Sequence, residues 1–204
     1  ELLTFSENEG ITDFFLQIIY VDDDRGGLKL KQPEILGTYI REAGERGIRV
    51  HALDGAPDFA LERRHADVLA RVHAVLDYNE NAPATERYVG IRMDVEPYTM
   101  EEWRAGGASR DAVMAEFLSM NRKVVDLIRE RDPDMPYGVD IPFWFDALDD
   151  DGNPRFEIEF EGNRNNLTVH LINMVDNIGI MAYRHRATGP NSILSVSEGE
   201  LAAS

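Results

Sequence analysis

The segment Gly90–Tyr98 ends in two carboxylates at alternate positions, Asp94 and Glu96. Because side chains alternate along a strand, Arg92, Asp94 and Glu96 should point to one face, with neighbours in this set about 6.6 Å apart. Two carboxyl groups this close in a partly dry site cannot both ionise freely, so the pKa of one should rise. General acid catalysis near neutral pH needs a carboxyl group with a raised pKa. An exposed strand end, or a salt bridge from Arg92, is the plainer interpretation of the same pattern.

A second chemically suggestive strand end follows later, where Met181 and Tyr183 share one face of the segment Ile180–Arg184. An Asp-x-Glu that ends one strand, followed by a Met-x-Tyr that ends the strand after next, resembles the chitinase-like glycoside hydrolases of family 18. Members of that family are (β/α)8 barrels with D-x-x-D-x-D-x-E on strand 4 and M-x-Y-D on strand 6. Here Asp94 and Glu96 match the last Asp and the Glu, while Met181 and Tyr183 match the Met and the Tyr.

The resemblance implies hydrolysis of a glycosidic bond in an N-acetylated carbohydrate. Glu96 would protonate the glycosidic oxygen, Asp94 would orient the substrate's own acetamido group as the nucleophile, and Tyr183 would hydrogen-bond the acetamido carbonyl oxygen. Such a retaining, substrate-assisted mechanism needs no second catalytic carboxylate and implies no cofactor. The chain departs from the family motif at three acidic positions, which are occupied by Val89, Arg92 and Arg184.

Other polar and aromatic residues lie near the predicted strand ends. Trp144 follows a strand and could stack on a sugar ring, or simply pack against its neighbours. Asp54 could bind a sugar hydroxyl or cap the turn that follows it. Asp140 should face the barrel interior, where Arg92 is its natural partner because a buried charge needs one. The residues expected to contact substrate are Asp54, Tyr98, Asp140, Trp144, Met181 and Arg184.

These residues would be positioned by alternating strands and helices. Five apolar runs are predicted as strands: Phe14–Val21, Ile48–Leu53, Tyr88–Val95, Tyr137–Ile141 and Ile178–Tyr183. Helical patterns separate them over 33–47, 61–76, 111–130 and 167–175, with a last helix from about Ser192 and a short hairpin in Phe156–Phe160. Such alternation requires an α/β fold with a parallel sheet.

Two parallel folds fit this alternation, an open doubly wound sheet and a (β/α)8 TIM-type barrel. No strand is followed by G-x-G-x-x-G or a P-loop, and the strand ends are acidic and aromatic, so the barrel is favoured. Counted on the family motif, the chain would cover about strands 2 to 6. Residues 1–204 are therefore predicted to be a single barrel domain that is incomplete at both ends.

Composition excludes several classes of protein. The chain has 204 residues, with 21 Lys and Arg against 38 Asp and Glu, a net charge of 21 − 38 = −17. Such a chain should repel phosphate backbones, so a nucleic-acid partner is not expected. The absence of cysteine excludes disulfides and thiolate metal sites. No run reaches the ~20 apolar residues of a membrane helix, and no leader pattern is visible. The sequence does not fix the cellular location or the oligomeric state.

Two alternative functions follow from the same residues. A metal-dependent sugar isomerase or aldolase-type barrel could use His51 with Asp54, Asp94 and Glu96, although no H-x-H or H-E-x-x-H spacing is present, so no metal is predicted. A catalytically inactive carbohydrate-binding barrel would accommodate arginine at acidic family positions. Metal-dependent activity would identify the first alternative, and sugar binding without turnover the second.

Overall fold

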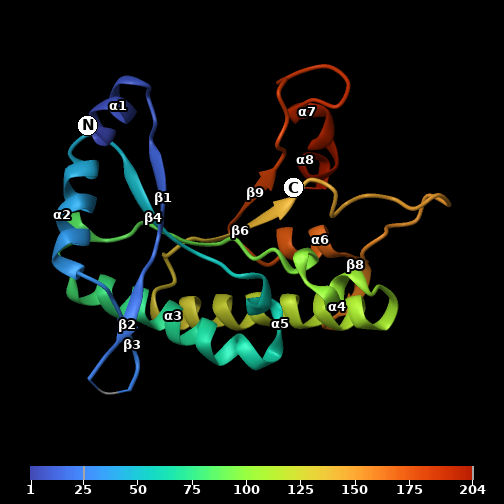
Figure 1. Cartoon of the computed structure of the whole chain (residues 1–204), viewed down its shortest axis with the longest axis horizontal. Helices are drawn as coiled ribbons and strands as arrows, with labels where there is room; N and C mark the ends of the chain where they lie inside the picture. Colours follow the sequence, from blue (N-terminus) through green and yellow to red (C-terminus); the bar gives the residue numbers. More distant parts are fainter. Residues whose placement is uncertain (25, 204) are drawn as a thin grey trace.

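The computed structural model describes residues 1–24 and 26–203 and contains a five-stranded parallel sheet (Figure 1). Its strands, in spatial order, are β1 (Asp13–Gln17), β4 (Arg49–Asp54), β5 (Ile91–Met93), β6 (Tyr137–Pro142) and β9 (Asn177–Met181). The spatial order follows the chain order without reversal. Right-handed crossovers that always step in one direction place the connecting helices on one face. This is the arrangement of a barrel wall, and the sheet is a curled half-barrel of the (β/α)8 type.

Helices connect successive strands of the sheet. They are α2 (Pro33–Gly44), α3 (Glu62–Asn81), α5 (Gly107–Arg131) and α6 (Leu167–Ile172). Pro33 suits the first turn of α2 because the N–H it lacks has no partner there. Gly47, at φ +73°, lets the chain leave the helix for β4. α3 and α5 pack side by side below the sheet in Figure 1. Within the described residues, no helix is long and apolar enough to cross a membrane.

Shorter elements flank the five-stranded sheet and its helices. Two hairpins pair β2 (Tyr20–Asp22) with β3 (Leu28–Leu30) and β7 (Glu157–Phe160) with β8 (Asn163–Asn166). The remaining elements are α1 (Leu2–Asn8), η1 (Pro57–Ala60), η2 (Ala84–Glu86), η3 (Pro97–Thr99), α4 (Glu101–Arg104), α7 (Ile193–Val196) and α8 (Glu198–Ala203). The predicted hairpin in Phe156–Phe160 is therefore only the first strand of a longer hairpin.

The burial pattern of β4 separates the two faces of the sheet. Val50, Ala52 and Asp54 are buried beneath the helices, whereas Arg49 is exposed and His51 half-buried on the opposite, interior face. β5 continues the alternation: Ile91, Met93 and Val95 are buried against the helices, while Arg92, Asp94 and Glu96 lie half-buried on the interior face. The common direction predicted for the three charged side chains is confirmed.

The first predicted strand is wrong in its extent and in its burial. It leaves the sheet after Gln17, because from Tyr20 onward the chain pairs antiparallel with Leu28–Leu30 in the β2–β3 hairpin. It is also not buried on both faces. β1 is an edge strand whose interior side is uncovered within the described residues, and Phe15 and Ile19 are 46% and 60% exposed.

The third and fifth predicted strands are also too long. β5 is ladder-bonded only over Ile91–Met93, and the flanking residues form loops and the 3₁₀ turn η3. β9 ends at Met181, because Ala182 N–H turns back and donates to the Ile180 carbonyl at 2.8 Å. Tyr183 therefore stands on the loop after the strand rather than in it.

Candidate active site

A hollow of about 400 Å³ opens at the carboxyl ends of β5, β6 and β9. Its lining residues are Asp94, Asp140, Gly179, Ile180, Met181, Ala182, Tyr183 and Ile193. The hollow thus brings together four of the residues predicted from the sequence, one from β6, one from just beyond β5 and two from β9 and its loop. In parallel α/β folds, binding sites lie at this end of the strands.

Asp94 is one of the two carboxyl groups that line this hollow. Its Oδ1 is buried and has no hydrogen-bond partner within the described residues. Burial raises the pKa of Asp94 first of all, and the nearby carboxylates of Asp140 and Glu96 raise it further, against the opposing effect of Arg92. The sequence predicted a raised pKa for one of the two carboxyl groups Asp94 and Glu96, and the pKa of Asp94 is raised.

Glu96 follows Asp94 on the same interior face but does not line the hollow. Its Oε1 accepts a hydrogen bond from the Tyr98 hydroxyl, and its carbonyl accepts one from the Thr99 hydroxyl at 2.8 Å. These bonds form in the η3 turn that Pro97 begins. Burial and then Glu96 raise the pKa of Tyr98, with smaller effects from Asp94 and Tyr183. Tyr98 therefore remains a hydrogen-bond donor to Glu96 at neutral pH.

Asp140 and Arg92 form the ion pair expected between neighbouring strands. Arg92 Nη1 donates to Asp140 Oδ1 at 2.7 Å, and Nη2 donates to the Asn177 side chain. The guanidinium also stacks on the Phe15 ring, 4.7 Å from its centroid. Burial raises the pKa of Asp140, and Arg92 opposes that rise. Sequence reasoning missed Gly179, although a glycine within a strand can signal a close approach: a Cβ there would lie 2.0 Å from Asp140 Oδ1.

Tyr183 lines the hollow, whereas Arg184, the next residue, does not. The Tyr183 side chain is 81% exposed, whereas Met181 is buried in the wall. Arg184 lies over the Phe143 ring at 4.3 Å and donates to Asn191 Oδ1 at 2.8 Å. Arg184 also donates to the Tyr183 carbonyl at 3.0 Å, so it fixes the loop that carries Tyr183.

Trp144 packs in an aromatic cluster beside Glu96. Its ring meets Tyr98 edge-on at 4.9 Å, Phe145 at 5.1 Å and Phe156 at 5.5 Å between centroids. Trp144 is only half-buried, so part of its surface stays accessible. The packing interpretation therefore holds for part of the side chain, and a sugar could contact only the part that remains exposed.

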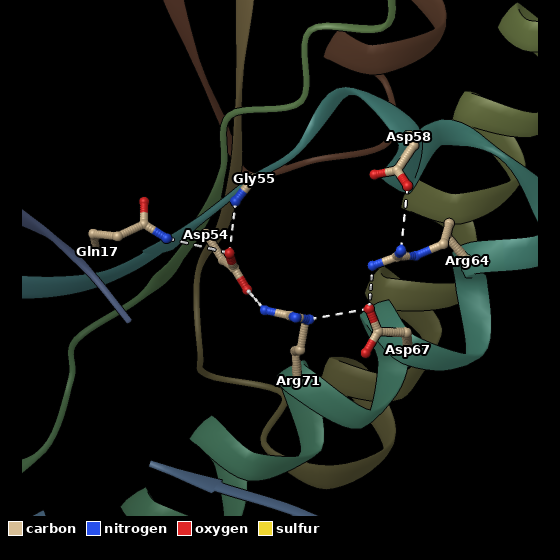
Figure 2. Close-up of polar contacts among 7 residues, drawn as sticks. All are labelled: Gln17, Asp54, Gly55, Asp58, Arg64, Asp67 and Arg71. Atoms are coloured by element: carbon tan, nitrogen blue, oxygen red, sulfur yellow. Dashed lines mark hydrogen bonds and ion pairs between the residues drawn. The ribbon is translucent and has the colours of Figure 1, made fainter. Parts of the chain in front are cut away.

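Asp54 is not brought to the hollow. It lies on the helix-facing side of β4 and is 6% exposed. Its carboxylate accepts from Gly55 N–H at 2.8 Å, as the turn-capping alternative predicts, and from Arg71 Nη1 at 3.2 Å (Figure 2). The sequence did not point to Arg71, because nothing in α3 distinguishes it from the other surface arginines.

The metal-site alternative gains no support from the described residues. His51 bonds Asp13 at 2.9 Å and stacks on Phe15 at 4.8 Å, nearer the start of the sheet than Asp94. No group of three or more His, Asp or Glu within the described residues is arranged to hold a metal ion.

Comparison with known proteins places the fold. No protein-family model and no curated protein matches the sequence. Among solved structures, a chitinase from Rhizomucor miehei is 17% identical, with a TM-score of 0.53 over 96% of this chain and 59% of that one. A β-1,4-mannanase from the sea hare Aplysia kurodai is 14% identical, with a TM-score of 0.50 over 74% of this chain and 54% of that one. The chain thus spans less than two thirds of either structure, and it has the barrel fold of chitinase-like glycoside hydrolases.

Proposed function

We propose that this chain carries the acid–base residues of a glycoside hydrolase, with Glu96 as the proton donor to the glycosidic oxygen. The observation that carries the proposal is the half-buried Asp94 carboxyl group, which lines a hollow with Asp140 and Tyr183 while Glu96 follows on the same face. Burial and the neighbouring carboxylates of Asp140 and Glu96 raise the pKa of Asp94, so this site favours a protonated carboxyl group more than an exposed one would.

We further propose that the nucleophile is the substrate's own acetamido oxygen. Asp140, the other carboxylate in the hollow, is engaged by Arg92 and is poorly placed to attack. Asp94 would orient the acetamido N–H, and the exposed Tyr183 hydroxyl would hydrogen-bond the acetamido carbonyl. This division of roles needs no second free carboxylate.

The surrounding side chains would complete substrate binding. The free side of Trp144 and the Tyr98 ring offer an apolar surface to a sugar face. Met181 lines the hollow, Asp140 offers acceptor oxygens, and Arg184 holds the loop that carries Tyr183. Asp54 was expected to bind a sugar hydroxyl; its position beneath α3 instead suits an indirect contribution.

The decisive experiment replaces Glu96 by Gln in the complete protein and measures hydrolysis of N-acetylglucosamine oligomers. Loss of the acid should reduce kcat on the order of 10²–10⁴-fold. For a substrate with an aryl leaving group, kcat should fall less, because such a group needs less protonation to depart. Glu101→Gln is the matched control, since Glu101 is exposed at the start of α4. Wild-type rates in Glu96→Gln on the natural linkage would eliminate the assignment.

A thiazoline analogue of N-acetylglucosamine tests substrate assistance separately. It mimics the bicyclic intermediate and should bind roughly 10²-fold or more tightly than substrate, as transition-state analogues do. Efficient turnover of a glycan with a bare 2-hydroxyl group, uninhibited by thiazoline, would reject this mechanism and leave Glu96 as the acid. Sugar binding without turnover would identify an inactive carbohydrate-binding barrel, the second candidate, which the arginines at positions 92 and 184 favour.

We also propose that residues 1–204 form one barrel domain whose wall is completed by further strands. Phe15 in β1 and Ile19, which follows that strand, are exposed, and open sheet edges carry unpaired backbone groups. A protein limited to these 204 residues should therefore self-associate, which light scattering over a concentration series would detect. A stable monomer at high concentration would argue against the proposal.

A further inference from the structure

The buried carboxylate of Asp54 is held from several sides. Gly55 N–H and Gln17 Nε2 donate to Oδ1 at 2.8 and 3.3 Å, and Arg71 Nη1 donates to Oδ2 at 3.2 Å. Burial raises the pKa of Tyr20 first, and the Asp54 carboxylate beside it raises that pKa further. A buried charge with this many fixed partners stabilises one arrangement of the strand end and disfavours others.

Arg71 is itself fixed in place. Its guanidinium lies between the rings of Tyr20 and Phe59, 4.9 and 5.1 Å from their centroids. Arg71 Nε donates to Asp67 Oδ2 at 3.2 Å. Figure 2 shows the chain of contacts continuing from Asp67 to Arg64, which donates at 2.7 Å. Arg71 therefore ties the end of β4 to the middle of α3.

The same strand end contacts the backbone of Asp94 directly. Asp94 N–H donates to the Asp54 carbonyl at 2.9 Å. Gly55 lies so close that a Cβ on it would be 1.9 Å from the Asp94 carbonyl oxygen. Both contacts are backbone contacts, so the position of Asp54 and Gly55 determines where the Asp94 main chain lies.

We propose that Arg71 and Asp54 are positioning residues that hold the Asp94 carboxyl group over the hollow. Arg71 fixes the Asp54 side chain, Asp54 fixes the end of β4, and the Asp94 peptide follows through its hydrogen bond to Asp54. The inference rests on the role proposed above for Asp94. Rigid supporting contacts of this kind matter because displacement of a reacting group by about 1 Å can cost 10²-fold in rate.

The test replaces Arg71 by Met and follows Asp94 itself. The titration of the Asp94 carboxyl carbon is recorded by NMR, with the signal assigned from an Asp94→Asn sample. A loosened strand end admits water, so the Asp94 midpoint should fall toward the ordinary value of about 3.9. In the same variant kcat should fall roughly 10-fold to 10²-fold with little change in KM. Arg71→Lys keeps the charge but not the two-pronged contact, and should lie between wild type and Met.

Arg131→Met is the matched control. The Arg131 side chain is 25% exposed, as is that of Arg71, and it also bridges two carboxylates, Asp77 and Glu80. It should lower the melting temperature without moving the Asp94 midpoint. Should Arg71→Met prove too unstable to study, Gly55→Ala tests the same link, because the added methyl group pushes Asp94 away without removing a charge.

The two proposals can fail independently. If the protein hydrolyses no glycan, the Asp94 midpoint in the Arg71 variants still decides whether Arg71 positions it. A lower melting temperature with an unchanged Asp94 midpoint, in Arg71→Met or in Gly55→Ala, would overturn the positioning role and leave a purely structural ion pair.

Discussion

Arg92 on β5 donates to the Asp140 carboxylate on β6 at 2.7 Å, with the two side chains only 11% and 21% exposed. The pair joins neighbouring strands on the interior face, and its Asp140 lines the hollow together with Asp94. It neutralises two charges that could not be buried singly. It also engages Asp140 with a structural partner, which is why the proposed mechanism assigns its roles to Asp94 and Glu96 instead.

Removal of Arg92 should therefore be costly. Arg92→Met leaves Asp140 buried without its cation, and the free energy of unfolding should fall by about 3–5 kcal/mol in urea denaturation. Arg122→Met is the control, because the Arg122–Glu161 pair is far more exposed, at 35% and 49%, and its loss should cost at most about 1 kcal/mol. An equal loss of unfolding free energy in the two variants would contradict a buried ion-pair role for Arg92.

Gly179 should be required for this ion pair to form. A methyl group there would lie 2.0 Å from Asp140 Oδ1 and 2.7 Å from Arg92 Nη1, so Gly179→Ala should destabilise the fold by about 1–3 kcal/mol. Gly44→Ala is the control, since that position in α2 has open space around it and should gain up to about 1 kcal/mol. Thermal unfolding of both variants measures the change in stability. A Gly179→Ala variant as stable as the wild type would show that β6 and β9 move apart at little cost.

Glu200 in α8 should make stability fall as pH rises. It is 2% exposed, and burial, with a smaller contribution from Asp146, raises its pKa to about 7 from 4.5. Because the folded pKa is the higher one, its contribution to stability is complete below pH 4.5 and is lost as pH rises through about 7. Glu200→Gln should therefore raise the melting temperature at pH 8 by about 2–4 °C or more, and leave it unchanged near pH 4.

Glu198→Gln serves as the comparison for this titration, since Glu198 is exposed on the same helix. Its melting temperature should follow that of the wild type at both pH values. If the melting temperature of Glu200→Gln also follows that of the wild type from pH 4 to pH 8, folding does not raise the pKa of Glu200.

Tyr183→Phe should separate function from stability. The side chain is 81% exposed, so loss of its hydroxyl should change the free energy of unfolding by no more than about 0.5 kcal/mol. Turnover of an N-acetylated substrate should nevertheless fall, because the acetamido carbonyl loses its donor. Tyr137→Phe is the opposite case: its buried hydroxyl donates to Asn121 Oδ1 at 2.7 Å, and its loss should cost about 1–3 kcal/mol. Unaltered kinetics in Tyr183→Phe would remove Tyr183 from the mechanism.

The sequence by itself determined that the strands form a parallel sheet and that the charged side chains of its central strand, β5, point to one face. Buried strands and amphipathic helices have different hydrophobic periods, and these are local properties that survive in any tertiary context. Alternation along β5 likewise placed Arg92, Asp94 and Glu96 on one face and predicted that Arg92 would meet Asp140. Burial beside like charges raised one pKa in this group, that of Asp94, as the residue types implied.

Only the tertiary structure decided which partner the Asp54 carboxylate takes and where the strands end. Ile48, Val50 and Ala52 alternate with Arg49 and His51, which agrees with the helix-facing position of Asp54, but nothing in this pattern identified Arg71 on α3 as its partner. β1 is short because the residues from Tyr20 onward pair with Leu28–Leu30 instead of continuing the sheet. Tyr183 lies outside β9 because the chain turns at Ala182, and no local sequence signal marks that turn. Contacts between segments far apart in the chain decide where a strand ends and which partner a buried charge finds. The residues of the strand itself do not carry this information.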